Sequence, residues 1–186
     1  MLFRSFVEYI IKAYIKPGVE PSLIKKAGNI EQWDGNLGAG ILNAGIVTER
    51  AMQLAKENGM GCVALSNTNH WMRGGSYGWQ AAKKGFAFIG FTNTIANMPA
   101  WGALDQKLGN NPLVIAIPYN EEAIVLDMAM SQYSFGAMEM AVIKKEPLSY
   151  QGGFDKDGNL TNDPSAILAT RRPLPIGYWK DRKSVV

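Results

Sequence analysis

Residues 67–79 read Asn-Thr-Asn-His-Trp-Met-Arg-Gly-Gly-Ser-Tyr-Gly-Trp, and this stretch contains the only histidine of the chain, His70. Asparagine and glycine are poor fillers of strands and helices, so the stretch indicates a tight loop. Its histidine, arginine and tryptophans offer a proton-active ring, a fixed positive charge and flat stacking surfaces, which together suit a nucleotide cofactor. The residues alone equally fit a well-packed loop whose histidine makes one structural hydrogen bond.

Composition places the chain among globular proteins of one domain or slightly more. It has 186 residues, of which 47% are hydrophobic and 19% charged, so it can form a core. The net charge of +3 is spread along the chain without a basic stripe, so we expect no nucleic-acid partner. Glu8 and Lys12 interrupt the apolar N-terminus, and no run of about 18 apolar residues follows, so we expect neither a signal peptide nor a membrane partner.

The single cysteine, Cys62, lies in the apolar run 61–65 and is expected to be buried as a small hydrophobic side chain. One cysteine cannot form a disulfide within the chain, which fits a reducing, cytoplasmic location. One histidine and one cysteine also cannot provide the ligand spacing of a metal site, so we expect no metal.

Hydrophobic spacing predicts helices that alternate with short buried strands, which indicates an α/β or mixed α+β layer architecture. Helices are expected at residues 2–15, 40–58, 77–84 and 135–144. Strands are expected at residues 61–66, 86–92, 113–117 and 123–130, and residues 147–175 are expected to be mostly turns. Residues 35–40, Gly-Asn-Leu-Gly-Ala-Gly, have neither the order nor the context of a dinucleotide-binding glycine motif.

Asp127 lies in a strongly apolar predicted strand. Alternation places Val125 and Asp127 on one face, and Ile124 and Leu126 on the other. An ionised carboxylate is costly to bury there unless it is paired or hydrogen-bonded. Asp127 therefore either orients a catalytic histidine, as in a catalytic triad, or caps a loop at the end of its strand.

Two further stretches offer polar groups. Asn110 and Asn111 lie in a turn that leads into a strand, where they can bind a polar substrate or make the side-chain to backbone bonds common for asparagine in turns. Trp179 and Lys180 can meet a phosphate or carboxylate, or they can be a surface aromatic with a lysine beside it.

These stretches together resemble the malate/L-lactate dehydrogenase-like oxidoreductases, a nicotinamide-dependent family without a Rossmann fold. The resemblance extends from about Phe6 to Lys180, and the run 67–79 is long and rich in rare residues, so we regard it as specific to one branch of the family. The matching stretches are residues 30–34, 67–82, 98–99, 101–103, 109, 111–112, 127–128, 152–155, 158–161 and 177–180.

The resemblance implies the family's non-Rossmann NAD(P)-binding fold and the reduction of a 2-oxo acid to a 2-hydroxy acid. It implies that Asp127 orients the catalytic histidine, that Asn110 and Asn111 belong to a substrate-side turn, and that the complete enzyme is a homodimer. The cofactor residues it implies are His70, Trp71, Met72, Arg73, Gly74, Ala123, Ile124, Val125, Leu126, Asp127, Met128, Ala129, Trp179 and Lys180. Arg73 is the only arginine on the loop that could meet a 2′-phosphate, so NADH is favoured over NADPH.

Departures from the family pattern bear on activity. The family's proton-donating histidine lies in a Ser-His-Gly stretch ahead of the first helix expected here, so we expect the chain to be a fragment that is inactive by itself. Leu2 stands where the family has an arginine that grips the substrate carboxylate, and Asn110 replaces a usual threonine. We therefore expect a partial reductase domain over residues 1–180 and an unmatched tail over 181–186. Malate, lactate, sulfolactate or a cyclic imino acid remain alternative substrates.

Overall fold

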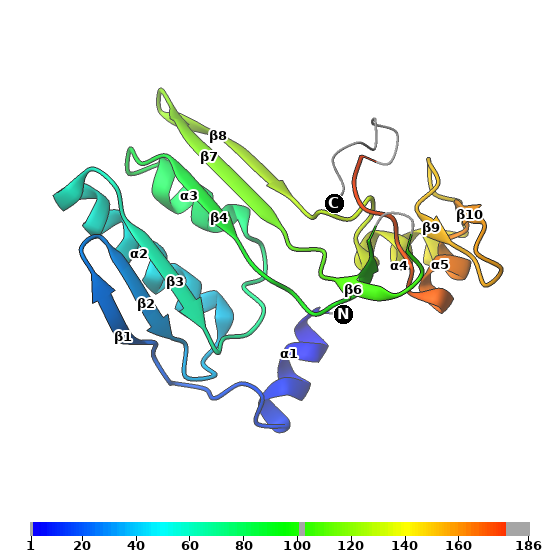
Figure 1. The fold of residues 1–186 in the computed structure, drawn as a ribbon, viewed down its shortest axis with the longest axis horizontal. Coiled ribbons are helices and arrows are strands. Elements are labelled where there is room, and N and C mark those ends of the chain that lie inside the picture. The colour runs from blue at the N-terminus through cyan, green and yellow to red at the C-terminus, as the bar shows by residue number, and fades with distance from the viewer. Residues whose placement is uncertain (1, 101–102, 178–186) are drawn as a thin grey trace. The chain divides into compact units, whose positions relative to one another are not determined.

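The computed structural model describes residues 2–100 and 103–177, in which helices alternate with strands (Figure 1). This confirms the expected mixed α/β architecture. The chain divides into two compact units, one made of residues 1–89 with 114–126 and the other of residues 90–113 with 127–186. Within the described ranges, no helix is long and apolar enough to cross a membrane.

The first unit begins with a three-stranded sheet covered by one long helix. Its elements are α1 (Leu2–Ile11), β1 (Ser22–Ala27), β2 (Ile30–Asp34), α2 (Gly40–Asn58), β3 (Cys62–Ser66) and α3 (Gly75–Ala82). β1 pairs antiparallel with β2, and β2 pairs parallel with β3. The parallel pair requires a crossover, which α2 provides while it lies against one face of the sheet (Figure 1).

Glu31 and Arg50 join this sheet to its helix. Glu31 is 1% exposed in the middle of β2, and its carboxylate accepts bonds from Arg50 Nε at 2.9 Å and Nη2 at 2.6 Å. Trp33 Nε1 donates to the same carboxylate at 2.9 Å. The Arg50 guanidinium lowers the pKa of Glu31 to about 2, so the carboxylate stays charged inside the fold.

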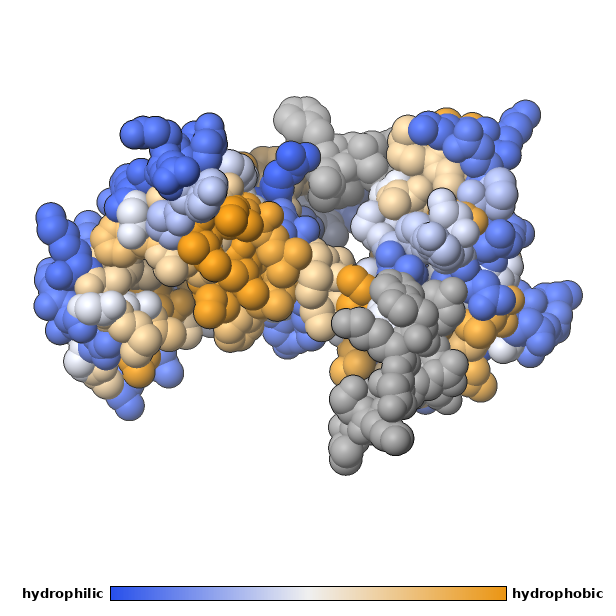
Figure 2. Space-filling view, turned by 90° about the horizontal axis from the view of Figure 1, so that it is seen from above, coloured by the Kyte–Doolittle hydropathy of each residue, from blue (hydrophilic) through white to orange (hydrophobic). Residues whose placement is uncertain are grey.

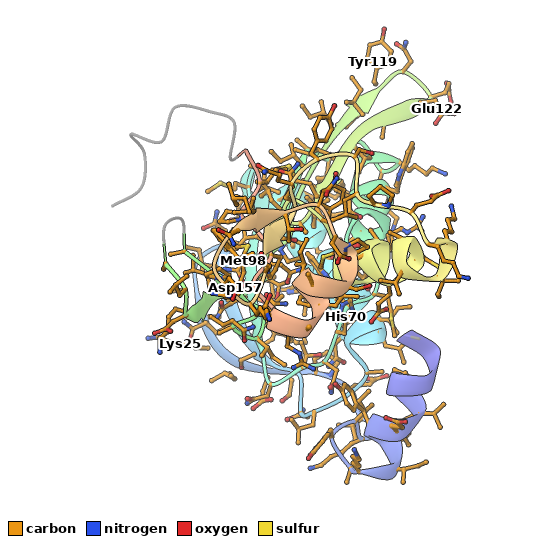
Figure 3. The ribbon with its side chains drawn as sticks, turned by 90° about the vertical axis from the view of Figure 1, so that its right-hand side faces the viewer. Lys25, His70, Met98, Tyr119, Glu122 and Asp157 are labelled. Atoms are coloured by element: carbon orange, nitrogen blue, oxygen red, sulfur yellow. The ribbon has the colours of Figure 1, made fainter. Side chains whose placement is uncertain are left out.

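A second sheet, in the order β4-β7-β8, lies mostly in the first unit. Its strands are β4 (Phe88–Phe91), β7 (Leu113–Tyr119) and β8 (Glu122–Met128). Tyr119 and Glu122 project from the tip of the β7–β8 hairpin (Figure 3). Val114 is fully buried, whereas Ile117 and Ile124 are 52% and 60% exposed. Hydrophobic side chains accordingly gather on the molecular surface near this hairpin (Figure 2).

The second unit has short strands and two helices around a small core. Its elements are β5 (Met98–Pro99), β6 (Gln106–Leu108), α4 (Phe135–Lys144), β9 (Gly153–Phe154), β10 (Leu160–Thr161) and α5 (Pro164–Thr170). Met138, Leu148 and Ile167 are buried against one another between the two helices. β5 pairs antiparallel with β6, and β9 with β10.

Two helices lie where hydrophobic spacing and terminal residues predicted them. The expected helix 40–58 is confirmed, and it stops where Gly59 takes the left-handed φ of 79°. The expected helix 135–144 is also confirmed, with the Ser134 hydroxyl accepting the Ala137 N–H at 3.1 Å. The helix expected at 77–84 lies at Gly75–Ala82 instead.

Other expectations were wrong for identifiable reasons. The first helix ends at Ile11 because Ala13 adopts a φ of 55° and the Tyr14 N–H turns back to the Tyr9 carbonyl. Residues 164–170 form α5 rather than turns, since Asp163 caps a helix whose first residue is Pro164.

Cys62 is exposed rather than buried, because it lies on the sheet face away from α2. Its partner in register, Ile30, is 48% exposed, whereas the neighbouring pair contains the buried Glu31. The strand that holds Cys62 is therefore covered on one face only, and not buried on both as expected.

Candidate functional site

Residues 67–74, called the His70 loop below, form the expected tight loop and lead from β3 into α3, whereas residues 75–79 of the same stretch are helical. Asn67 and Met72 both adopt left-handed φ values, 47° and 66°. The Asn67 amide donates to Asp34 Oδ2 at 3.1 Å, and the Asn69 amide donates to the Tyr14 carbonyl at 2.9 Å. Bonds to two other segments therefore hold the loop in a conformation that non-glycine residues adopt only at a cost.

The first turn of α2 packs directly on this loop. A Cβ at Gly40 would lie 2.5 Å from the Asn69 carbonyl carbon and 2.7 Å from the His70 carbonyl oxygen. Asn43 is fully buried, and its amide donates to the Gly35 carbonyl at 2.9 Å and to Thr68 Oγ1 at 3.0 Å. The helix thus clamps the loop through a glycine that permits close approach and an asparagine that bonds both neighbours.

The glycine-rich run 35–40 follows β2 and opens α2, so the expectation that it lacks a strand–helix context was wrong. Its order still differs from the dinucleotide-binding pattern. A Cβ at Gly35 would lie 2.8 Å from the Thr68 side chain, and one at Gly38 would meet the Val19 carbonyl at 2.6 Å. Thr68 and Val19 occupy the space that phosphates fill in such motifs. These glycines therefore allow neighbouring segments of the chain to pack closely.

His70 is held by one bond within its own loop. Its Nδ1 accepts the Met72 N–H at 2.9 Å, while the residue remains exposed. Partial burial of the ring lowers the pKa of His70 below its usual range. Neutral imidazole is therefore the favoured form, and its position in the fold is labelled in Figure 3.

The ring of Trp71, in the loop, stacks on the ring of Tyr77, in α3. Their ring centroids lie 5.7 Å apart at an interplanar angle of 27°, and the Tyr77 hydroxyl donates to the Trp71 carbonyl at 2.6 Å. Burial raises the pKa of Tyr77 to about 12, so the phenol stays protonated at any physiological pH. This phenol acts as a structural donor that fixes the loop.

α3 packs closely on β7 and β8 because its N-cap, Gly74, and its residue Gly78 lack side chains. A Cβ at Gly74 would lie 2.8 Å from both the Trp71 ring and Val114, and one at Gly78 would lie 3.6 Å from Val125. The His70 loop and the strand that contains Ala123, Ile124, Val125 and Leu126 therefore belong to one packed unit. The expected alternation of β8 is confirmed by Val125 facing α3 while Ile124 and Leu126 are exposed.

Asp127 and Met128 end β8, and Ala129 follows it, at the start of the second unit. Asp127 is exposed, so it is not the buried carboxylate that an apolar strand suggested. Two residues beyond Met128, the Met130 N–H donates to the Asn110 carbonyl at 2.7 Å. The strand end and the asparagine turn are thus brought together.

The side-chain oxygens of Asn110 and Asn111 bond Thr94. Thr94 Oγ1 donates to Asn110 Oδ1 at 2.9 Å, and the Thr94 N–H donates to Asn111 Oδ1 at 2.9 Å. These bonds tie the turn to the segment after β4 and support the turn-stabilising interpretation of both asparagines. Thr94 was not singled out from the sequence, and no local pattern marks it.

Three buried side-chain oxygens have no hydrogen-bond partner within the described ranges: Asn43 Oδ1, Asn97 Oδ1 and Gln132 Oε1. The Asn97 N–H bonds the Leu108 carbonyl, two residues before Asn110, and Gln132 lies two residues after Met130. Buried acceptors without partners are uncommon in proteins.

An open cleft of about 420 Å³ lies beside the His70 loop at the carboxyl end of β2. Only Asn67 of the loop lines it, and none of the residues expected to bind a cofactor does so. The lining residues are Lys16, Val19, Asp34, Asn36, Leu37 and Asn67. Across the described part of the chain, no three histidine, cysteine, aspartate or glutamate side chains gather as metal ligands would.

The family model for malate/L-lactate dehydrogenases matches residues 1–182. The chain belongs to the malate/L-lactate dehydrogenase family. A 2,3-diketo-L-gulonate reductase from Klebsiella pneumoniae (strain 342) is 48% identical over 178 residues, which cover 96% of this chain and 53% of that protein. The chain therefore spans about half the length of the curated relatives it matches.

Two solved dehydrogenase structures show the same fold. A malate dehydrogenase from Entamoeba histolytica aligns with a TM-score of 0.87 at 30% identity, covering 92% of this chain and 49% of that one. A sulfolactate dehydrogenase from Methanocaldococcus jannaschii aligns with a TM-score of 0.85 at 31% identity, covering 94% and 51%. The expected family resemblance is thus confirmed.

Trp179 and Lys180, which the resemblance assigns to the cofactor, lie outside the described residues. The structure adds Asn43 and Tyr77 as supports of the His70 loop, neither of which was selected from sequence. Neither the asparagine in the first turn of α2 nor the tyrosine six residues after Trp71 belongs to a recognisable motif. Only their hydrogen bonds in the structure show that they support the loop.

Proposed function

We propose that this chain takes part in the NAD(P)H-dependent reduction of a 2-oxo acid to a 2-hydroxy acid, with 2,3-diketo-L-gulonate as the substrate. The observation that carries the proposal is the 48% identity, over 96% of the chain, to a relative of that name. The uncommon composition of the His70 loop supports it, because histidine, arginine and tryptophan on one loop suit a nucleotide.

The residues that we assign to the cofactor fit an anionic dinucleotide. His70 and Arg73 are exposed on one loop, and both offer N–H donors. Trp71 to Gly74 continue that loop, and we assign the β8 residues Ala123 to Ala129, together with Trp179 and Lys180, to the same cofactor. When bound, the nicotinamide supplies the hydride, and the protein supplies position and electrostatics.

Asp127 is assigned as the carboxylate that orients the proton-donating histidine. Reduction of a ketone also needs a proton for the developing alkoxide, which a general acid provides. We do not give this task to His70. Its Nδ1 accepts the Met72 N–H, so the ring cannot become a doubly protonated acid without breaking that bond. His70 is the only histidine among these 186 residues, so the proton donor of this proposal is not among them.

Asn110 and Asn111 are assigned to the substrate side of the site. Their side-chain oxygens are bonded to Thr94, so their amide N–H groups are the groups offered to a substrate carboxylate or hydroxyl. We assign a small-molecule 2-oxo acid as ligand, NADH in preference to NADPH, a homodimer and a cytoplasmic location.

Two alternatives differ in what they predict. In the first alternative, the chain serves the same chemistry on malate or sulfolactate, as the names of the two solved relatives suggest, or on lactate or a cyclic imino acid. The malate and sulfolactate dehydrogenases are 30% and 31% identical to this chain, well below the 48% of the diketogulonate reductase. The chain by itself could also be inactive, because it spans about half the length of its curated relatives.

A chimera tests the proposal. The 178 aligned residues of the Klebsiella reductase are replaced by those of this chain, and NADH oxidation is followed with 2,3-diketo-L-gulonate and with the 2-oxo acids that correspond to malate, lactate, sulfolactate and a cyclic imino acid. The unmodified reductase is the control, and the 186-residue chain is assayed beside both. Diketogulonate turnover by the chimera supports the proposal, turnover of another acid supports the first alternative, and a folded chimera without any turnover contradicts it.

A further inference from the structure

Three glycines of the chain follow directly after an aspartate or an asparagine. The pairs are Asp34–Gly35, Asn58–Gly59 and Asp157–Gly158. In such a pair the glycine nitrogen can attack the side-chain carbonyl carbon of the preceding residue, because glycine has no Cβ that obstructs the approach. A cyclic succinimide forms, and hydrolysis of this ring leaves isoaspartate. Ring closure requires an available glycine nitrogen and a side chain that can turn towards it, so the fold decides which pair reacts.

The pair Asp34–Gly35 is held closed at both reacting groups. The Gly35 N–H donates to the Ser66 carbonyl at 2.8 Å. Asp34 Oδ1 accepts the Asn36 N–H at 2.7 Å, and Oδ2 accepts the Asn67 amide at 3.1 Å. Neither the nitrogen nor the carboxylate can move towards the other without breaking these bonds.

The pair Asn58–Gly59 is held by the last turn of α2. The Gly59 N–H donates to the Ala55 carbonyl at 2.7 Å, and the Asn58 amide donates to the Leu54 carbonyl at 2.9 Å. Both bonds must break before the ring can close, so this pair reacts only when the end of the helix unwinds.

The pair Asp157–Gly158 has neither restraint. It lies in the loop between β9 and β10, and Asp157 is exposed and labelled in Figure 3. Among residues 2–100 and 103–177, the Asp157 carboxylate has no hydrogen-bond or ion-pair partner. The Gly158 N–H reaches only the Asp155 carbonyl at 3.3 Å, beyond the usual range of about 2.7–3.2 Å.

The loop around this pair is fixed by other atoms. Asp155 Oδ1 accepts the N–H groups of Asn159 at 2.8 Å and of Asp157 at 2.9 Å. These bonds, that of Asn159 above all, hold the pKa of Asp155 below its usual range, so its carboxylate remains a charged anchor. A Cβ at Gly158 would meet no atom within 4 Å, so there is open space beside the reacting nitrogen.

We propose that Asp157 is a site of spontaneous isomerisation to isoaspartate, through a succinimide formed with Gly158, and that the fold protects the other two pairs. The Gly158 nitrogen loses its proton and bonds to Asp157 Cγ, while a carboxyl oxygen leaves as water. Water then opens the ring at the main-chain carbonyl of Asp157. The product has the same atoms as the starting protein, and no oxidant or cofactor takes part.

Isomerisation changes the loop because isoaspartate adds one methylene to the main chain between β9 and β10. The Asp155 N–H donates to the Asn159 carbonyl at 2.9 Å across this loop, and the Asn159 N–H returns to the Asp155 side chain. A longer connection separates these partners. We therefore expect faster hydrogen exchange of the Asp155 and Asn159 amides in the isomerised protein than in fresh protein.

Peptide mapping of the 186-residue chain tests the proposal. Trypsin places the three pairs in separate peptides, residues 27–50, 57–73 and 157–171. After several weeks at physiological temperature, at neutral and at mildly acidic pH, isoaspartate is quantified in each peptide by enzymatic methylation and by mass spectrometry. We expect at least about tenfold more in peptide 157–171 than in either other peptide, because each of the other pairs must first lose two hydrogen bonds. Equal amounts in the three peptides, or a larger amount in peptide 57–73, overturns the assignment.

Two controls separate the fold and the residue. In urea all three pairs should react, and Asn58 should lead at neutral pH because an amide loses ammonia more readily than an ionised carboxylate loses water. A ranking that urea leaves unchanged would show that the fold does not select the pair. Asp157→Glu keeps the negative charge but closes only a larger ring, which forms much more slowly. This variant should lose the isoaspartate of peptide 157–171, and a persistent signal would place the reaction at another residue and refute the proposal.

Discussion

Gly40→Ala should destabilise the protein through a collision between α2 and the His70 loop. The added Cβ would lie 2.5 Å from the Asn69 carbonyl carbon and 2.7 Å from the His70 carbonyl oxygen, and it would overlap the Asn69 carbonyl oxygen even more closely. All of these atoms are backbone, so no side-chain rotation can relieve the contact. Either the helix or the loop must move.

The size of the effect follows from that displacement. An ordinary van der Waals contact begins at 3.4 Å. To bring the new Cβ to that distance from the Asn69 carbonyl carbon, the backbones of α2 and the loop must move apart by about 0.9 Å. Overpacking of this kind costs about 1–3 kcal/mol, and the upper end applies because both partners are held by further bonds. Alanine gains at most about 1 kcal/mol of helix propensity over glycine. We therefore expect a net loss of about 2 kcal/mol in the free energy of unfolding.

Gly45→Ala provides a matched control in the same helix. The nearest atom to a Cβ at Gly45 is Gln80 Oε1 at 4.0 Å, so the methyl group fits without displacement. This variant should gain about 0.5–1 kcal/mol, and the two alanines should therefore differ in sign. Urea unfolding followed by circular dichroism measures both, with the denaturant slope checked for constancy.

The amide resonances of Asn69 and Met72 locate the change. They should shift strongly in Gly40→Ala and remain near their wild-type positions in Gly45→Ala. The reasoning is refuted if Gly40→Ala is as stable as wild type, or if Gly45→Ala loses as much stability as Gly40→Ala. Either result would mean that α2 does not clamp the loop as the structure shows.

Three further changes test the fold and the site. Glu31→Gln should cost about 2 kcal/mol at pH 7, less than the roughly 3 kcal/mol that a pKa of about 2 implies, because the guanidinium partner is a quarter exposed. Since the folded-state pKa is lowered, the deficit seen in urea unfolding should shrink as the pH falls from about 4.5 towards 2, and a constant deficit would contradict the ion-pair role. Asp163→Ala removes the acceptor of the Ser165 N–H and should lower the stability by about 1 kcal/mol, whereas an unchanged melting temperature would mean that the cap is dispensable. In the chimera, Asp127→Asn should lower turnover far more than NADH affinity, while Glu122→Gln at the hairpin tip should change neither; a turnover loss below about threefold, roughly 0.6 kcal/mol, would refute the orienting role.

Several features of this protein could be predicted from short stretches of sequence. Helix α2 ends at Gly59 because glycine adopts the left-handed conformation without strain, and its apolar spacing locates its body. The alternation around Val125 correctly separates the two faces of β8. The cap at Asp163 was equally present in the sequence but was interpreted as a turn, since the same residues occur in both.

The tertiary structure decided which faces are covered and which loops are joined. Cys62 lies in an apolar run, yet it is exposed because α2 covers only the opposite face of its sheet. Thr94 bonds Asn110 across 16 positions and Asn43 bonds Thr68 across 25, and neither pair leaves a local pattern. Periodicity and capping depend on a few neighbouring residues, so a sequence shows them directly. Contacts between distant segments depend on how whole elements pack, and for that reason the support of the His70 loop became visible only in the folded chain.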